Sequence, residues 1–130
     1  MIEELPDGDS ACHGDPNGGN FMCHGDKIRL IDWVDCVKGN PLYDITEYIL
    51  MNEYPAIPTD LPDGIISFLT ANFMKFTNVF LAEYGRLSGV DLSGVSAWRI
   101  PLLVAKMGGN NSEEKQAQLL EGIRKELRGI

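Results

Sequence analysis

Three polar side chains in the first quarter of the sequence have the types and the spacing of one reaction site. Asp15 is followed five residues later by Asn20, and a second acid, Asp32, stands twelve residues after that. Carboxylate and amide oxygens are the ligands that a hard cation such as Mg²⁺ takes, usually one or two carboxylates completed by substrate phosphates. A carboxylate can also accept a proton from a reacting hydroxyl group. We therefore expect these three side chains to meet in one site.

The chain between Asn20 and Asp32 predicts a β-hairpin that brings these two residues together. Residues 21–23 and 28–31 are short apolar runs, and the polar, glycine-containing stretch 24–27 separates them. A turn in this stretch returns the second strand to the side of Asn20, so Asp32 follows it there. The expected pairs are Cys23 with Ile28 and Asn20 with Ile31.

These residues and their surroundings resemble a known family. An acid, an asparagine five residues on and a hydrophobic strand ending in Asp form the arrangement of the catalytic and metal loops in kinase-fold phosphotransferases. The form His13-Gly14-Asp15, with Ile31-Asp32-Trp33 and the later segment Gly39-Asn40-Pro41-Leu42-Tyr43-Asp44, is similar to the aminoglycoside phosphotransferase and choline kinase branch. The motifs run from about Cys12 to Asp44, a quarter of the chain, and the helical remainder agrees only in character.

The resemblance implies a role for each residue of the motifs. Asp15 matches the catalytic base that takes the proton of the accepting hydroxyl, and Asn20 and Asp32 match the Mg²⁺ ligands that bridge the phosphates of ATP. His13 matches a structural residue that bonds the backbone near the metal loop. Asp44 matches an acid that braces the catalytic loop from the start of the following helix. The implied reaction is ATP- and Mg²⁺-dependent phosphorylation of a small-molecule hydroxyl, with an aminoglycoside- or choline-like acceptor.

Two features depart from the family. Residues 16–19, Pro-Asn-Gly-Gly, fill an interval in which family loops often carry an aromatic residue or His-Pro, and the two glycines have more conformational freedom to lose on ordering. Only fourteen residues precede Asp15, so we expect the nucleotide-binding amino-terminal lobe to be absent. No glycine-rich phosphate loop occurs elsewhere in the sequence. We therefore expect the isolated chain to have little or no phosphotransfer activity.

Length and charge narrow the class of protein. A chain of 130 residues is one domain by the usual size rule. Its net charge of −8 argues against nucleic acids and anionic membrane surfaces as partners. The charge would suit a cationic acceptor, or it serves only to keep the protein soluble. We find no apolar run near the roughly 20 residues of a membrane span, and the acidic amino terminus is unlike a signal peptide, so we expect a cytoplasmic protein.

The three cysteines favour a reducing compartment, because an odd number cannot all pair within the chain. Cys12-His13 and Cys23-His24 repeat the tetrapeptide Cys-His-Gly-Asp, but this spacing matches no common zinc pattern. We instead expect Cys12 and Cys23 to be small buried hydrophobic residues.

Two residues next to Asp32 carry expectations as well. We expect Trp33 to pack against the core and Asp35 to be either a further ligand or an exposed loop carboxylate.

Beyond residue 40, apolar residues at helical spacing predict about four helices. The second is the longest, with Thr59 or Asp60 as its cap and with Gly85 and Gly89 marking its end. Its apolar stripe is so broad that we expect several neighbours to bury it. The stripe consists of Ile65, Leu69, Phe73, Phe76, Phe80 and Tyr84. The other helices are expected from Pro41, capped by Asn40, to about Asn52, from Ser96 onward with Pro101 inside, and from Ser112 onward.

The expected fold is α+β and mainly α-helical, the carboxy-terminal lobe of a protein-kinase-like fold with a short catalytic β-hairpin and about four helices. It is one domain, residues 1–130, with the catalytic loop, hairpin and metal loop in residues 1–40 and the helical part in residues 41–130. The expected partners are ATP and a small-molecule acceptor, and the uncovered surface predicts either docking of the missing lobe or self-association. Two functions stay open: a phosphotransferase, and a non-catalytic domain that keeps this lobe and binds a small molecule or a protein.

Overall fold

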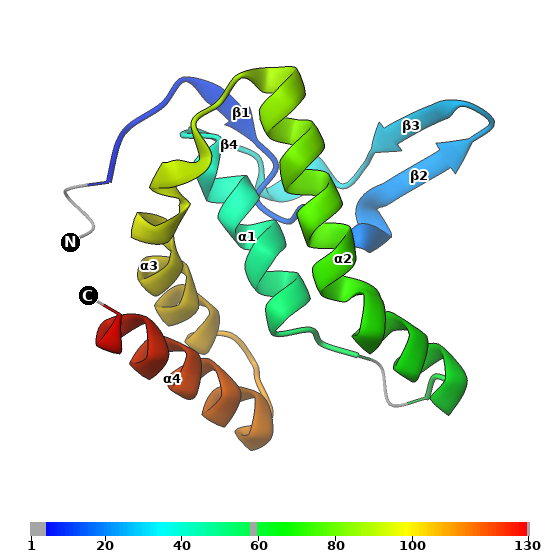
Figure 1. Ribbon diagram of the computed structural model, residues 1–130, viewed down its shortest axis with the longest axis vertical. Helices are drawn as coiled ribbons and strands as arrows, with labels where there is room; N and C mark the ends of the chain where they lie inside the picture. The colour runs from blue at the N-terminus through cyan, green and yellow to red at the C-terminus, as the bar shows by residue number, and fades with distance from the viewer. Residues whose placement is uncertain (1–4, 58–59, 130) are drawn as a thin grey trace.

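The computed structural model describes residues 5–57 and 60–129. In this part of the chain, four helices follow two short antiparallel strand pairs (Figure 1). The helices are α1 (Leu42–Glu53), α2 (Asp63–Ser88), α3 (Val95–Met107) and α4 (Glu113–Arg128). The strand pairs are β1 (Ser10–Cys12) with β4 (Val37–Gly39), and β2 (Phe21–His24) with β3 (Lys27–Leu30). An α+β, mainly helical class is confirmed, whereas the assignment to a carboxy-terminal lobe stays a prediction.

The β2–β3 hairpin forms in the predicted register. Cys23 pairs with Ile28, and the backbone N–H of Ile31 donates to the carbonyl of Asn20 at 2.9 Å. Gly25 supplies the positive φ of 62° that the two-residue turn requires. Figure 1 shows the hairpin projecting from the helices. Cys23 is therefore exposed, and the prediction that it is buried is wrong because no other layer covers this hairpin in the described residues.

The β1–β4 pair was not predicted from the sequence, because strands of three residues show no measurable alternation. Cys12 pairs with Val37 and Ser10 with Gly39. The pair joins the chain just before the catalytic loop to the chain just after the metal loop. It therefore holds together the two ends of the segment that contains Asp15, Asn20 and Asp32. Cys12 is buried there, as predicted, and its thiol donates to the carbonyl of Asn40 at 3.3 Å. Burial raises the pKa of this thiol.

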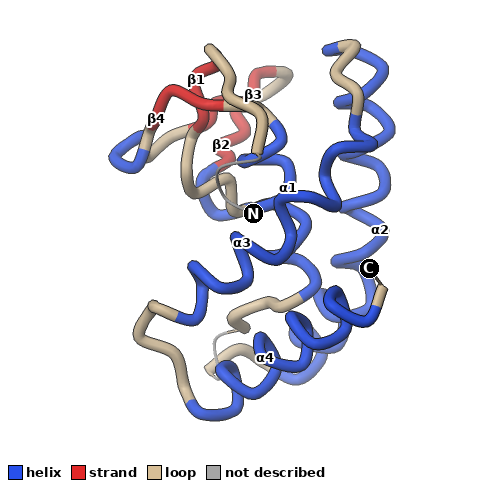
Figure 2. Tube along the Cα trace, turned by 90° about the vertical axis from the view of Figure 1, so that its left-hand side faces the viewer, coloured by secondary structure: helices blue, strands red, loops and turns tan. Residues whose placement is uncertain are grey.

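The main core lies between α1, α3 and α4, and α3 runs beside α4 in both views (Figures 1 and 2). Each helix contributes from one apolar stripe, as expected for surface helices that bury a single face. The buried residues of this core are Leu50, Leu102, Leu103, Leu119 and Ile123. A second cluster, Leu42, Ile45 and Ile49, packs between α1, the end of α2 and the 3-10 turn Leu92–Gly94. Helix α1 is thus the element that both clusters share.

The predicted starts of three helices can be compared with the caps that the structure forms. Asn40 caps α1, since its Oδ1 accepts the N–H of Leu42 at 2.9 Å. Ser112 caps α4, since its Oγ accepts the N–H of the third helical residue at 3.2 Å. Helix α2 begins after Pro62, which makes no side-chain cap bond. Asp60 therefore lies ahead of the helix, and Thr59, the other predicted cap, lies outside the described residues.

Helix α2 corrects the prediction of a buried apolar stripe. Only Thr77 is buried along its 26 residues. One side packs on α1, where the rings of Phe80 and Tyr48 lie 4.4 Å apart, while its first turns extend past the end of α1 (Figure 1). Its exposed apolar residues include Ile65, Phe68, Met74, Phe76, Val79 and Leu87. The prediction is wrong because a broad apolar stripe shows how much apolar surface a helix has, but not how much of that surface other elements cover. The described residues cover only part of it.

The same helix also corrects the expectation that no apolar run reaches the length of a membrane span. By length and composition, α2 is long and apolar enough to cross a bilayer. Between Gly64 and Ala82 its only charged residue is Lys75. Length and composition alone do not place this helix in a membrane, because an apolar helix of a soluble protein meets the same criteria.

Candidate active site

The structure places Asp15 and Asn20 in direct contact. Asn20 Nδ2 donates to the backbone carbonyl of Asp15 at 2.9 Å and to its Oδ2 at 3.2 Å. Asn17, which is not among the predicted site residues, donates from Nδ2 to the same carboxylate oxygen at 2.8 Å. Two amide groups thus fix Oδ2 of Asp15, and Oδ1 has no hydrogen-bond partner among the described residues. The carboxylate is oriented through one oxygen and open at the other.

Turn chemistry in the interval between Asp15 and Asn20 explains this geometry. Asn17 caps the 3-10 turn Gly18–Asn20, because its Oδ1 accepts the N–H of Gly19 at 2.8 Å. Asparagine followed by glycine is typical of such turns, since its side chain mimics a backbone turn. Asn17 therefore uses one end of its amide to close the turn and the other to hold Asp15. The Asn-Gly pair inside the loop is the sequence signal that could have identified Asn17.

His13 connects the catalytic loop to the strand that precedes Asp32. Its side chain is 1% exposed, and its Nε2 lies 2.8 Å from the carbonyl oxygen of Ile31. Its Nδ1 accepts the backbone N–H of Asp15 at 3.2 Å. Because a carbonyl can only accept, these contacts require the neutral ring with the proton on Nε2. His13 thus ties the residue before Asp32 directly to Asp15.

Asp32 stands at the end of the hairpin, next to Ile31 and therefore beside Asn20. Its carboxylate is exposed and has no hydrogen-bond partner among the described residues. Its backbone is left-handed, with φ of 62° and ψ of 61°, and no other non-glycine residue in the described ranges has a positive φ. This conformation costs an L-residue roughly 1–2 kcal/mol and persists only where surrounding structure imposes it, often at functional sites.

The two predicted metal ligands fit a hard cation by their chemistry. Asn20 uses its Nδ2 toward Asp15, which leaves Oδ1 as an acceptor. Asp32 adds a carboxylate without another partner, and one or two such groups together with substrate phosphates are the usual protein contribution to a Mg²⁺ site. In residues 5–57 and 60–129 no group of three or more His, Cys, Asp or Glu side chains could hold a metal ion. The metal role of Asn20 and Asp32 stays a prediction.

The metal-loop neighbours differ partly from expectation. Trp33 is 47% exposed rather than packed in the core, so that prediction is wrong. Its ring instead stands edge-on against His13, with centroids 4.7 Å apart, and its Nε1 donates to the carbonyl of Leu30 at 2.9 Å. Asp35 is an exposed loop residue whose backbone carbonyl passes close to Gly14. A Cβ at Gly14 would lie 2.4 Å from that oxygen, and φ there is +86°, so the position requires glycine.

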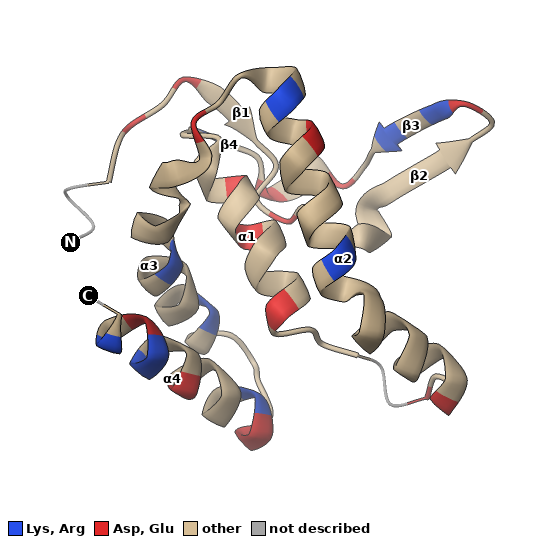
Figure 3. Cartoon of the chain, in the orientation of Figure 1, with Lys and Arg blue, Asp and Glu red and all other residues tan. Residues whose placement is uncertain are grey.

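A buried ion pair lies behind the loop. Glu47 on α1 is 6% exposed, and its carboxylate lies 2.5 Å from the ammonium of Lys106 on α3. Figure 3 shows the acidic positions along α1 and the basic positions on the neighbouring α3. Burial raises the pKa of Glu47 and so do the charges of Asp15 and Asp44, whereas Lys106 lowers it. The sequence signal for Glu47 is its spacing of three residues from Asp44, which puts both acids on one face of α1.

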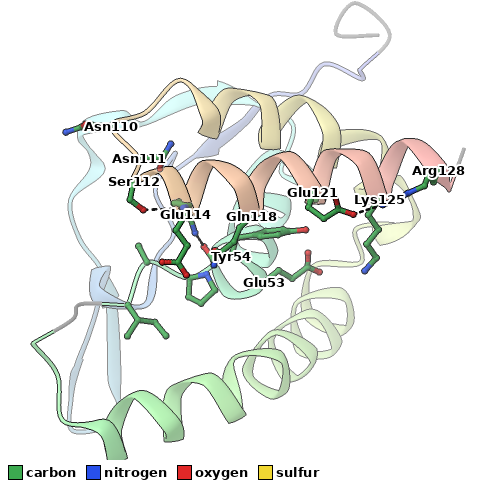
Figure 4. Close-up of a pocket in the computed structure, with 15 residues that line it drawn as sticks. Glu53, Tyr54, Asn110, Asn111, Ser112, Glu114, Gln118, Glu121, Lys125 and Arg128 are labelled. Atoms are coloured by element: carbon green, nitrogen blue, oxygen red, sulfur yellow. Dashed lines mark hydrogen bonds and ion pairs between the residues drawn. The ribbon is translucent and has the colours of Figure 1, made fainter.

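Two hollows open on the side of α4 that faces the end of α1. One, of about 440 Å³, reaches the catalytic loop and is lined there by Asn17 and Gly18. The other, of about 1070 Å³, follows α4 away from that loop (Figure 4). Tyr54 and Lys115 line both of them. The smaller cavity is therefore the one next to Asp15.

Comparison with known protein families agrees with this geometry. The model of the phosphotransferase enzyme family, APH, matches residues 2–98, which include Asp15, Asn20, Asp32 and Asp44. No curated protein and no solved structure matches the chain significantly. The family match confirms the resemblance drawn from the motifs and covers well over half of the 130 residues. The chain therefore belongs to the phosphotransferase enzyme family.

Proposed function

We propose that the chain carries the acceptor side of an ATP- and Mg²⁺-dependent phosphotransferase that acts on a hydroxyl group of a small molecule, in the reducing cytoplasm. One observation carries the proposal: the Asp15 carboxylate is oriented by Asn17 and Asn20 and open at Oδ1, beside the hairpin end that bears Asp32. Family membership supports the reaction class.

In this reaction the substrate hydroxyl donates a hydrogen bond to Oδ1 of Asp15. Its oxygen forms a new bond to the terminal phosphorus of ATP, the bond from that phosphorus to the bridging oxygen breaks, and ADP leaves. The hydroxyl proton passes to Asp15. Asn17 and Asn20 keep the carboxylate in one direction throughout, and positioning of this kind supplies much of the rate enhancement in phosphoryl transfer.

Asn20 and Asp32 would hold the Mg²⁺ ion. When bound, the ion neutralises charge on the phosphate oxygens. Asn20 then serves both halves of the site, since its Nδ2 orients Asp15 while its Oδ1 is available to the metal. The His13 contacts to Ile31 and Asp15 keep the two halves in register.

A complete reaction also needs groups that grip the nucleotide. The sequence contains no glycine-rich phosphate loop, and we expect little or no turnover by these 130 residues alone. The proposal therefore includes a nucleotide-binding lobe that acts together with this chain. Self-association is the other arrangement that the exposed apolar residues of α2 favour.

Nucleotide binding tests the proposal directly. Without the second lobe we expect isothermal titration calorimetry to detect weak, Mg²⁺-dependent binding of ATP through its phosphates alone. Asp32→Asn should weaken this binding by about tenfold or more, because a charge-assisted contact is lost. Asp35→Asn changes an exposed carboxylate three residues away and serves as the matched control. Identical titrations for the wild type and Asp32→Asn would overturn the proposal and favour a non-catalytic binding domain.

Turnover is a separate measurement. ADP release from ATP, followed with a panel of amino-alcohols and aminoglycosides, is expected to stay at background for the isolated chain. Turnover that is present in the wild type and absent in Asp15→Ala would contradict the expected inactivity and establish an enzyme.

A further inference from the structure

The smaller cavity is separated from the proposed base by a single side chain. Asn17 lines the cavity, and its Nδ2 donates to Oδ2 of Asp15 at 2.8 Å. The volume of about 440 Å³ lies within the roughly 300–1,000 Å³ of typical small-molecule pockets. The Asp15 carboxylate therefore lies within one side chain of the cavity.

The wall of this cavity is largely apolar. It combines residues from α1, α2, α4 and the chain after α1, namely Tyr48, Met51, Pro55, Ala56, Phe73 and Leu119. Such a surface cannot pair charged or strongly polar atoms of a ligand. The charged group of an acceptor must therefore meet one of the few polar side chains in the lining.

The described lining of the cavity contains ammonium groups but no carboxylate. Among the residues that the structure describes, Lys106 and Lys115 line it and no Asp or Glu does. Lys106 is paired with Glu47, whose side chain is 8% exposed and lies behind it. Lys115 donates to the backbone carbonyl of Tyr54 and has no carboxylate partner among the described residues. Because an ammonium group has three donors, Lys115 keeps two for a ligand.

Two further features favour an anion at Lys115. Burial, with the charge of Lys106 as the second cause, lowers the pKa of Lys115, which marks a cation that lacks a counter-charge. Lys115 also stands in the first turn of α4, where the helix dipole adds positive potential. A bound carboxylate or phosphate would supply the missing counter-charge to Lys115 and would be attracted by the positive end of the α4 dipole.

The larger hollow gives a contrast within the same molecule. Figure 4 shows Glu53, Glu114 and Glu121 along its lining together with the basic residues Lys125 and Arg128. Lys115 lines this hollow as well, so three carboxylates balance three cations there. Arg128 donates to Glu121 at 2.6 Å, so part of this charge is already neutralised. Its mixed lining has no preference for one sign of charge. Among the described residues, cations outnumber carboxylates in the lining of the cavity beside Asp15 but not in that of the larger hollow.

We propose that the smaller cavity is the acceptor pocket of the phosphotransferase and that its acceptor is an anionic alcohol. An apolar or aromatic body fills the cavity, a hydroxyl group lies at Asp15, and an anionic oxygen group, carboxylate or phosphate, binds Lys115 and Lys106. This inference rests on the proposed function and replaces the cationic acceptor that the net charge of −8 would suit. Distant surface charges are screened within about 10 Å, whereas the two lysines contact the ligand.

A matched series of benzyl alcohols tests the inference without nucleotide or metal. The members carry a para carboxylate, phosphonate, neutral amide or aminomethyl group, and the carboxylate and phosphonate arms distinguish the two anionic groups. By calorimetry we expect the better anion to bind about tenfold or more tightly than the amide, because its contacts are charge-assisted, and the ammonium member to bind most weakly. Lys115→Gln should remove this preference, and Lys115→Arg should retain it.

Lys125→Gln is the matched control, because Lys125 lies on the same helix but lines only the larger hollow. It should leave the anion preference unchanged, and urea midpoints should show that all variants are folded. Equal affinities across the series, tighter binding of the ammonium member, binding by no member, or a preference that survives Lys115→Gln would each overturn the inference. The Mg²⁺-ATP titration is independent of this one. Loss of metal-dependent ATP binding with a retained anion preference would refute the phosphotransferase and leave an anion-binding pocket.

Discussion

The carboxylate of Asp44 accepts the backbone N–H of His13 at 2.5 Å, across 31 residues of sequence. Its other oxygen accepts the N–H of Gly14 at 2.9 Å. The first turn of α1 thus holds the chain immediately before Asp15, and the same helix carries Glu47 and contributes residues to both apolar clusters. The position of the catalytic loop is therefore tied to the core through one side chain.

Removing this brace should destabilise the fold and disorder the loop. Asp44→Asn keeps the shape of the side chain but replaces one acceptor oxygen by a donor, so one backbone N–H loses its charged partner. We expect a loss of about 2 kcal/mol in the free energy of unfolding, the usual value for a hydrogen bond to a charged group. Urea unfolding measures it. Asp26→Asn, in the exposed hairpin turn, should change stability by less than about 0.5 kcal/mol, and equal effects of the two variants would contradict the brace.

Gly14 and Gly18 offer a matched pair of substitutions in one loop. Gly14→Ala should cost at least about 2 kcal/mol, because a left-handed alanine costs roughly 1–2 kcal/mol and the new Cβ meets the carbonyl of Asp35. A Cβ at Gly18 meets nothing within 4 Å, so Gly18→Ala should change stability by less than about 0.5 kcal/mol. Thermal or urea unfolding of both variants checks this, and a tolerant Gly14→Ala would show that the loop can move away from Asp35.

How much the sequence predicts depends on whether the information is local. The hairpin register, the cap at Asn40 and the start of the last helix at Ser112 are set by turn and capping residues a few positions apart, and the structure agrees with them. The contact of Asp15 with Asn20 also follows from a short loop with a fixed spacing. Local chemistry of this kind leaves few alternatives.

The parts that the sequence does not predict depend on distant partners. The β1–β4 pair joins two three-residue strands with no pattern of their own. The pairing of Glu47 with Lys106 spans 59 residues, and nothing near either residue specifies the other. The exposure of Phe68 and Phe76 on α2 likewise depends on which other elements cover the helix, and the apolar stripe of α2 does not predict those neighbours.

The burial of Glu47 should give the protein a pH dependence of definite sign. Its pKa is raised above the ordinary value of 4.5, chiefly by burial and against the pull of Lys106. The folded state then binds more protons than the unfolded state above pH 4.5, so the free energy of unfolding falls as pH rises through the raised pKa. Glu47→Gln lacks this carboxyl. The stability of the wild type minus that of the variant should therefore decrease with rising pH.

Urea unfolding between about pH 4 and pH 8 measures that difference. Glu83→Gln is the control for the loss of a carboxylate, because Glu83 pairs with Arg86 on the exposed surface, where such pairs contribute at most about 1 kcal/mol. A difference that increases with pH would show that attraction to Lys106 outweighs the cost of burying the Glu47 carboxylate.

Arg99 joins three helices through two ion pairs, so its replacement should lower the free energy of unfolding. Its guanidinium lies 2.5 Å from Glu53 at the end of α1 and 2.8 Å from Glu126 on α4, with all three side chains largely buried. Arg99→Gln would leave two partly buried carboxylates without a cation. Because these groups keep some contact with water, we expect a loss of about 2–3 kcal/mol, below the roughly 3–5 kcal/mol of a fully buried pair.

Arg86→Gln is the matched control for Arg99→Gln. Arg86 pairs with Glu83 on the surface of α2, where both side chains are more than half exposed, and such pairs contribute at most about 1 kcal/mol. Urea unfolding should therefore separate the two variants by at least about 1 kcal/mol. Similar losses would mean that water already screens the Arg99 pairs, and the junction of α1, α3 and α4 would then depend on its apolar core alone.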